Sequence, residues 1–113
     1  MTWTIDTALE DRNINVISKR VISEYKFTVG VLETVITIRT YKESEHGGYI
    51  FEQSHNIKTP EQISAYNPSR PWGDYEAYAV HLAVTSITQY YEQAINAGHE
   101  PNESWLIPNK HFI

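Results

Sequence analysis

The chain contains no cysteine among its 113 residues. This absence excludes disulfide frameworks, thiolate zinc sites and cysteine nucleophiles, and it fits a reducing compartment, so we expect a cytoplasmic protein. Glycine and proline are also scarce, with five of each, while 41% of the residues are hydrophobic. Disordered and fibrous classes are therefore excluded. Residues 1–113 form one domain, long enough to bury about two-thirds of the surface of the unfolded chain.

Long apolar runs are missing as well. No segment approaches the roughly 18 apolar residues of a membrane span. The opening sequence MTWTIDTALEDRN lacks the basic and apolar segments of a secretory signal. The local motifs of phosphate-binding loops, dinucleotide sites, nucleophile elbows, zinc proteases and EF-hands are absent too. We expect no membrane association and no cofactor.

Positive charge is sparse and unevenly placed. Nine Lys and Arg face 14 Asp and Glu, for a net charge of −5, and no Lys or Arg occurs between Pro71 and Asn109. A surface without cations cannot neutralise phosphates, so the second half predicts no nucleic-acid binding. The cations of the first half alternate with acids, which indicates a solvated sheet face.

Residues 14–58 are rich in the β-branched and aromatic residues typical of strands. The first strand is clear from Val21, and the run TVITI predicts a second, with a tight hairpin at Gly30 between them. YIFEQSHNI predicts a third strand, with Tyr49, Phe51, His55 and Ile57 on one face. Before Val21, a short helix near 7–12 is expected, and residues up to 20 stay open between helix and strand.

Residues 59–73 connect the strands to a helix. Thr59, Pro60 and Gln62 match a capping box and predict one helical turn over 60–65. NPSRPWG then excludes regular structure.

An amphipathic helix is predicted over 74–97, with Asp74 as its N-cap and Gly98 as its end. One arc of this helix is apolar, whereas Thr85 and Gln89 fall in the opposite, polar arc. In the tail, residues 98–113, the triplet Trp105-Leu106-Ile107 predicts an edge strand or a segment lying across the helix.

The predicted architecture is α+β, a three- to four-stranded antiparallel meander with one long C-terminal helix packed on one face. The uncovered face would carry Ile22, Ile36 or Val35, and Ile50. We therefore expect a homodimer, joined through this face or through a helix surface formed by Tyr75, Tyr78 and Leu82. These three side chains sit on the polar side of the helix, where exposed aromatics often mark a contact surface. Alternatively, the 66–73 loop or the tail covers them.

Arg70 is the most singular charge, because it is the only cation between Lys58 and Lys110 and Trp72 follows closely. Its guanidinium could bind the carboxylate or phosphate of a small ligand, or stack on Trp72. The structural alternative, which we favour, is a salt bridge to Asp74 or Glu76 that ties the loop to the helix.

Three histidines have candidate roles. His55, on a partly apolar strand face, could be a general base, although a hydrogen-bonded core residue is the commoner case. His81 falls in the solvent stripe of the helix beside Tyr78 and Leu82. His46 follows Glu43 and Glu45, but its turn offers no second histidine at ligand spacing, so no metal is expected.

The sequence thus favours a small non-catalytic module that binds an anionic ligand through Arg70, Trp72, Tyr75 and His55. One alternative is a protein-interaction or inhibitor module whose acidic, aromatic surface includes Tyr78, His81 and Leu82. The other is a small enzyme with a histidine as its acid or base.

Overall fold

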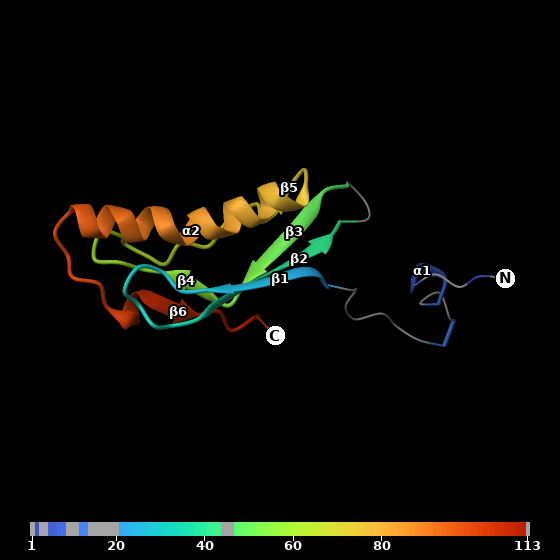
Figure 1. Cartoon of the computed structure of the whole chain (residues 1–113), viewed down its shortest axis with the longest axis horizontal. Coiled ribbons are helices and arrows are strands. Elements are labelled where there is room, and N and C mark those ends of the chain that lie inside the picture. The colour runs from blue at the N-terminus through green and yellow to red at the C-terminus, as the bar shows by residue number, and fades with distance from the viewer. Residues whose placement is uncertain (1, 3–4, 9–11, 14–20, 44–46, 113) are drawn as a thin grey trace.

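Two antiparallel sheets and one long helix make up the fold (Figure 1). The computed structural model describes residues 2, 5–8, 12–13, 21–43 and 47–112. The described elements are α1 (Ile5–Ala8), β1 (Val21–Phe27), β2 (Ile36–Lys42), β3 (Tyr49–Gln53), β4 (His55–Ile57), β5 (Trp72–Gly73), α2 (Glu76–Asn96), a 3₁₀ turn (Glu103–Trp105) and β6 (Leu106–Pro108). The larger sheet has the order β1-β2-β3-β5, and β4 pairs with β6 in a second sheet. The predicted α+β architecture with one long helix packed against strands is confirmed.

The strand β2 sets the two faces of the larger sheet. Ile38 lies opposite Tyr25 of β1 and opposite Gln53 of β3, so β2 is paired along both edges. Because side chains alternate along a strand, Ile36 and Ile38 share one face with these neighbours. Both isoleucines are fully buried beneath α2, so of the two alternatives predicted for the uncovered face, Ile36 and Val35, Ile36 does not lie there.

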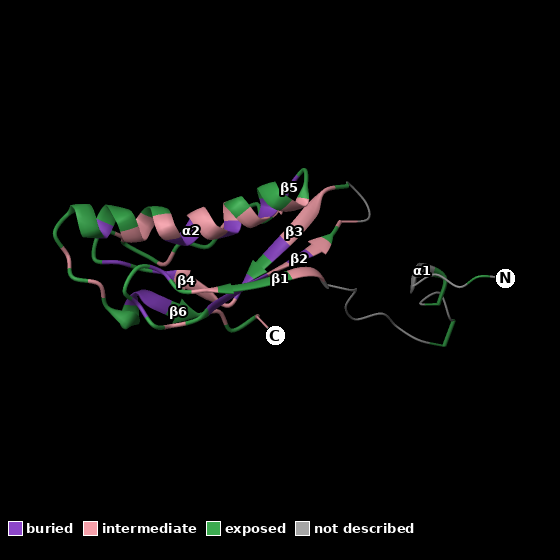
Figure 2. Ribbon diagram, viewed as in Figure 1, coloured by how far each residue is buried: buried purple, intermediate pink, exposed green. Residues whose placement is uncertain are grey.

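The helix α2 packs through small side chains. Its buried residues are Ala79, Ala83, Ser86, Ile87 and Ala94, and all but Ser86 belong to the predicted apolar arc. Figure 2 shows the buried residues gathered where α2 and the strands face one another. Alanines let the helix axis approach the sheet closely, and Ile36, Ile38, Phe51 and Ile57 fill the space between them.

The helix begins later than its sequence predicts. Tyr75 is the N-cap residue and makes no side-chain capping bond, so the prediction that Asp74 caps the helix is wrong. The strand β5 ends at Gly73, the chain bends at Asp74 and Tyr75, and Tyr75 itself has extended backbone angles, at φ −138° and ψ 161°. At the other end, Ala97 follows the last helical residue and Gly98 has φ +91°, which confirms the predicted stop.

The predicted third strand is divided at Ser54. The backbone N–H of Ser54 donates to Thr37 O at 2.8 Å, while its carbonyl accepts from the N–H of Asn109 at 2.8 Å. The side-chain Nδ2 of Asn109 also donates to Gln53 O at 3.0 Å. The tail therefore takes over the backbone partners of this segment, and β4 pairs with β6, which confirms the predicted edge strand at Trp105–Ile107 in its C-terminal part.

The connection between β1 and β2 is a wide loop rather than the tight hairpin predicted at Gly30. A turn forms there, with Leu32 N–H donating to Val29 O at 3.0 Å. The last β1–β2 pair is Phe27 with Ile36, so residues 28–35 form the loop between the two strands. The carboxylate of Glu103 holds the loop, because it accepts hydrogen bonds from the backbone N–H groups of Glu33 and Thr34 at 2.8 and 3.1 Å. The hydrogen bond from the Thr34 hydroxyl, followed by these backbone bonds, lowers the pKa of Glu103.

The capping contacts expected at Thr59 are present without a helix. Thr59 N–H donates to Gln62 Oε1 at 2.8 Å, and Glu61 N–H donates to Thr59 Oγ1 at 3.2 Å. Only a turn at 60–61 follows, so the helical turn predicted over 60–65 is wrong. The chain instead returns to the sheet, where Tyr66 N–H donates to Ile57 O at 3.0 Å.

Near the N-terminus, α1 covers residues 5–8, while residues 9–11 and 14–20 lie outside the described residues, as does the open choice between helix and strand there. Within the described ranges, no helix has the length and apolarity needed to cross a membrane.

Gly73 is the closest approach between β5 and α2, and it gives the first prediction. A Cβ atom at Gly73 would lie 2.7 Å from Ala79 N and 3.0 Å from Ala79 Cα, both rigid backbone atoms of the helix. We expect Gly73→Ala to lower the free energy of unfolding by about 1–3 kcal/mol, the cost of an overpacked site, as measured by urea denaturation. The matched control is Asp74→Ala, which should lose well under the ~1 kcal/mol of a broken N-cap. Equal stability of Gly73→Ala and the wild type would contradict this packing.

Candidate functional site

Residues 66–71, here called the Arg70 loop, cross from the second sheet to the first and lie against α2. The loop is held at both ends by backbone bonds, from Tyr66 N–H to Ile57 O at 3.0 Å and from Phe51 N–H to Pro71 O at 2.9 Å. The Tyr66 ring packs on that of Tyr90 of α2, with their centroids 5.0 Å apart. Because Pro68 and Pro71 lack backbone donors, the loop between these anchors forms no strand, and it passes over the helix.

A half-open pocket of about 270 Å³ lies between the Arg70 loop and α2, and we call it the Arg70 pocket. Its apolar lining is Phe51, Tyr66, Pro68 and Leu82. Its polar lining is Ser69, Arg70, Thr85, Ser86 and Gln89. Sites for small molecules are ordinarily more apolar than this mixed lining, and the volume is at the small end of such sites.

Arg70 is exposed and forms no ion pair or side-chain hydrogen bond within the described part of the chain. The salt bridge to Asp74 or Glu76 is therefore not formed. Its backbone carbonyl accepts from Trp72 N–H at 2.8 Å, which closes a tight turn at Pro71. The guanidinium donors of Arg70 thus have no partner among the described residues, and Arg70 is part of the pocket lining.

The pocket's other polar side chains divide into two kinds. Ser86 is buried, and its hydroxyl is within 2.7 Å of Ala83 O and 3.1 Å of Gln53 Oε1, so it is a structural group. Ser69 and Gln89 make no side-chain hydrogen bond to described residues. The Thr85 hydroxyl donates to His81 O at 2.9 Å and keeps its lone pairs free to accept.

The other predicted ligand residues lie away from the Arg70 pocket. Trp72 sits in β5 beside Ile50, and its indole N–H donates to Gly47 O at 2.9 Å. It packs on Gly48, where a Cβ atom would come within 2.7 Å of the indole ring. Tyr75 is 61% exposed at the start of α2. None of Trp72, Tyr75 and His55 lines the Arg70 pocket.

His55 lies in β4, opposite Pro108 of β6. Its Nδ1 atom is 2.8 Å from the Ser54 hydroxyl, which also accepts a hydrogen bond from Thr37 N–H at 2.8 Å. Partial burial lowers the pKa of His55 below its ordinary value. No carboxylate among the described residues hydrogen-bonds to His55, so the third group that a catalytic histidine requires is not assembled there.

The proposed helix surface has an aromatic end. The Tyr75 and Tyr78 rings are 5.8 Å apart, and the Tyr78 ring stacks on the His81 imidazole at 6.2 Å. Tyr75, Tyr78 and His81 are exposed, whereas Leu82 is half-buried against Phe51 and the buried alanines of α2. The structure therefore separates Leu82, which belongs to the Arg70 pocket, from an exposed row formed by Tyr75, Tyr78 and His81.

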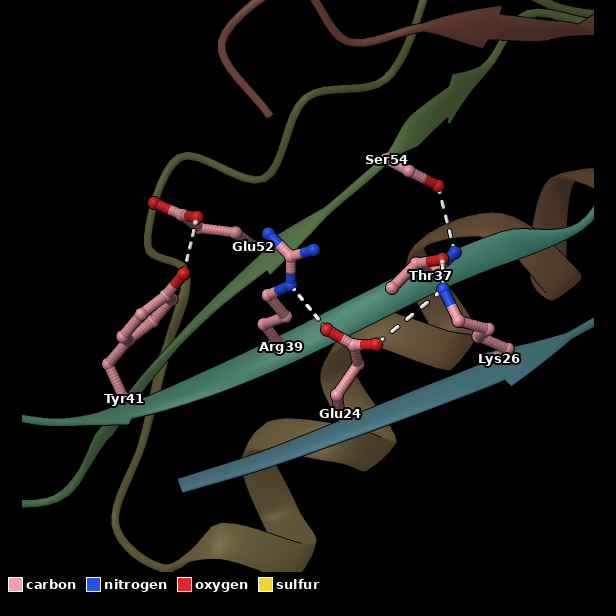
Figure 3. Close-up of polar contacts among 7 residues, drawn as sticks. All are labelled: Glu24, Lys26, Thr37, Arg39, Tyr41, Glu52 and Ser54. Atoms are coloured by element: carbon pink, nitrogen blue, oxygen red, sulfur yellow. Dashed lines mark hydrogen bonds and ion pairs between the residues drawn. The ribbon is translucent and has the colours of Figure 1, made fainter. Parts of the chain in front are cut away.

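The sheet face opposite α2 is polar (Figure 3). Arg39 Nε donates to Glu24 Oε2 at 2.6 Å, and Lys26 Nζ lies 3.5 Å from Glu24 Oε1. The hydrogen bond from Arg39 lowers the pKa of Glu24. The Tyr41 hydroxyl donates to Glu52 at 3.2 Å, and burial, followed by the charge of Glu52, raises the Tyr41 pKa. The face is thus a charged surface, as the alternation of cations and acids predicted.

The tail closes part of this polar face. The Phe112 ring lies 4.4 Å from the Arg39 guanidinium, a cation–π contact. A second half-open pocket, of about 230 Å³, lies beside it, between the Arg70 loop and the tail, with Glu52, Asn67, Asn109 and His111 among its polar lining.

Two contacts that anchor the tail had no local signal in the sequence. His99 Nε2 lies 2.6 Å from Glu61 Oε1, and Glu103 binds the β1–β2 loop. Both join residues far apart in the chain, so spacing alone could not show them. Where the structure describes the chain, no cluster of three or more His, Cys, Asp and Glu residues could hold a metal ion. Glu45 and His46 lie outside the described residues.

Comparison with protein-family models, curated proteins and solved structures gives no match.

The pKa of His55 makes stability depend on pH in a defined direction. Its folded-state pKa lies below the ordinary value of 6.5, so the unfolded chain takes up a proton first as the pH falls. The contribution of His55 to the free energy of unfolding should therefore decrease below pH 6.5 and level off beneath the folded-state pKa of His55. We expect His55→Gln to flatten this dependence, as measured by urea denaturation across the pH range. An unchanged slope in His55→Gln would contradict this assignment.

Proposed function

We propose that this protein is a small non-catalytic module that binds an anionic small molecule in the Arg70 pocket. The observation that carries the proposal is an arginine with no ion pair among the described residues, in the lining of a pocket that combines apolar and polar side chains. An unpaired guanidinium is matched in shape and charge to a carboxylate or a phosphate, which it can bind through two parallel hydrogen bonds.

The remaining lining supports a ligand with an apolar body. Phe51, Pro68 and Leu82 offer apolar contact, while the side chains of Ser69 and Gln89 have no hydrogen-bond partner among the described residues. A small organic acid would place its carboxylate on Arg70 and its carbon skeleton against these walls. The small volume favours a compact acid over a nucleotide.

The acidic residues around Arg70 in the sequence favour small anions over polyanions as ligands. No other Lys or Arg occurs between Lys58 and Lys110, and the same stretch contains several acids. Within this stretch of the chain Arg70 is the only Lys or Arg that an anion can meet, and the surplus of acids disfavours polyanions such as nucleic acids.

The test is thermal stabilisation by benzoate, succinate and inorganic phosphate, followed by isothermal titration with the strongest of the three. A carboxylate response with an apolar preference supports an organic acid, and a response confined to phosphate supports an oxyanion site. We expect Arg70→Gln to weaken binding about tenfold to a hundredfold, the equivalent of losing a hydrogen-bonded charge pair of roughly 1.5–3 kcal/mol. Lys58→Gln removes an exposed cation outside the pocket and is the matched control. Absence of any response, or identical binding by Arg70→Gln and the wild type, would refute the proposal.

A second candidate is a protein-interaction module that uses the row formed by Tyr75, Tyr78 and His81. It is favoured by the exposure of Tyr75 and Tyr78, 61% and 41%, in consecutive ring contacts on a helix without cations. Aromatic rings at such positions are enriched in protein interfaces. If this second function is the correct one, benzoate, succinate and phosphate should neither stabilise the protein nor bind it in the calorimetric titration. That result distinguishes the protein-interaction module from the anion-binding module.

A further inference from the structure

The strand β1 forms one edge of the larger sheet. Its only pairing among the described residues is with β2, so the other edge of β1 presents backbone donors and acceptors without a described strand partner. Edges of this kind are templates for adding a further strand. The opposite edge of the sheet is the two-residue strand β5, which is too short to act in the same way.

The apolar cover over β1 is incomplete. Tyr25 lies opposite Ile38, so its ring is on the α2 side of the sheet, yet it is 49% exposed. The main contacts of α2 are with β2, β3, β4 and β5, so among the described residues α2 contributes little cover to β1 beyond Phe27. An added strand would bury the Tyr25 ring as well as the backbone edge.

The charges of Glu24 and Lys26 favour one register for a strand added to β1. Glu24 and Lys26 lie on the polar face, on either side of Tyr25, and both reach the surface, with their side chains 38% and 59% exposed. We propose that β1 pairs antiparallel with β1 of a second copy of this chain, about a two-fold axis at Tyr25. Glu24 of each copy then lies opposite Lys26 of the other, and the two Tyr25 rings meet on the α2 side.

Neighbouring registers lack this complementarity. A two-fold axis at Glu24 would set two glutamates against each other, and an axis at Lys26 would do the same with two lysines. A lysine on an edge strand ordinarily opposes strand addition. Within one chain Lys26 already lies beside Glu24, and Glu24 also binds Arg39. In the proposed pairing the partner's glutamate adds a second acidic neighbour to Lys26, which favours a partner carrying the same sequence.

The irregularity between Val21 and Ser23 limits the pairing on one side. Regular pairing would run from Ser23 to Phe27, with Ser23 of one copy opposite Phe27 of the other. Both copies of α2 would lie on the same face of one continuous sheet, and the two Arg70 pockets would stay open at distant positions. The dimer is therefore independent of the proposed ligand function.

Charge reversal at the two positions tests the pairing by light scattering coupled to size exclusion. The wild type should elute as a dimer. Glu24→Lys alone places lysines opposite lysines, and Lys26→Glu alone places glutamates opposite glutamates, so each variant should raise the dimer dissociation constant on the order of tenfold. An equimolar mixture of the two variants should recover the dimer, because every opposing pair is then of unlike charge.

The mixture also controls for misfolding, since a variant that failed to fold would not be rescued by its counterpart. Lys42→Glu reverses an exposed charge on β2 outside the proposed interface and should remain dimeric. A monomeric wild type, a dimer unaffected by Lys26→Glu, or a mixture that stays monomeric would overturn the proposal. A dimer lost on substitution of Tyr78 instead would assign the interface to the helix surface and would equally overturn it.

Discussion

The structure depends on one close approach of backbone, where Gly73 of β5 meets Ala79 of α2. Only a residue without a side chain permits this contact, because a Cβ atom there would lie 2.7 Å from the Ala79 nitrogen. The contact sets the start of α2 against the edge of the sheet. A second close approach, between the Trp72 indole and Gly48, holds β5 against the glycines that precede β3.

These two contacts fix the course of the chain that forms the Arg70 pocket. With β5 pinned, the chain between Tyr66 and Pro71 must span from β4 to β3 across the helix, and two prolines prevent it from joining either sheet. The space left beneath the loop is the Arg70 pocket. The opposite face of the sheet is occupied by ion pairs and by the Phe112 ring, so the two sides of the sheet differ in character.

Elements governed by local pattern were predictable from the sequence. The β-branched run of β2, the apolar arc of α2 and the glycine that ends it are properties of neighbouring residues. Element ends decided by distant partners were not. Asn109 divides the third strand at Ser54, and the chain that leaves β5 enters α2 only after Tyr75.

The same distinction applies to the candidate site. Arg70 was identifiable because it is isolated in sequence, but Thr85 and Gln89 belong to the polar arc of the helix and would be expected in solvent. Only the path of the Arg70 loop over α2 brings them to one pocket. Trp72 is close to Arg70 in sequence, yet its indole N–H donates to Gly47 O, so its role is to hold β5 in the sheet.

The central claim is that the space between the Arg70 loop and α2 is an anion-binding site, and its most direct test maps binding on the protein itself. In a ¹H–¹⁵N correlation spectrum titrated with a small organic acid, we predict saturable shifts confined to the backbone amides of residues 69–70 and 82–89 and to the Arg70 side-chain Nε–H. Shifts that cluster at Tyr75 and Tyr78, that fall around His55, or that do not saturate would contradict the account.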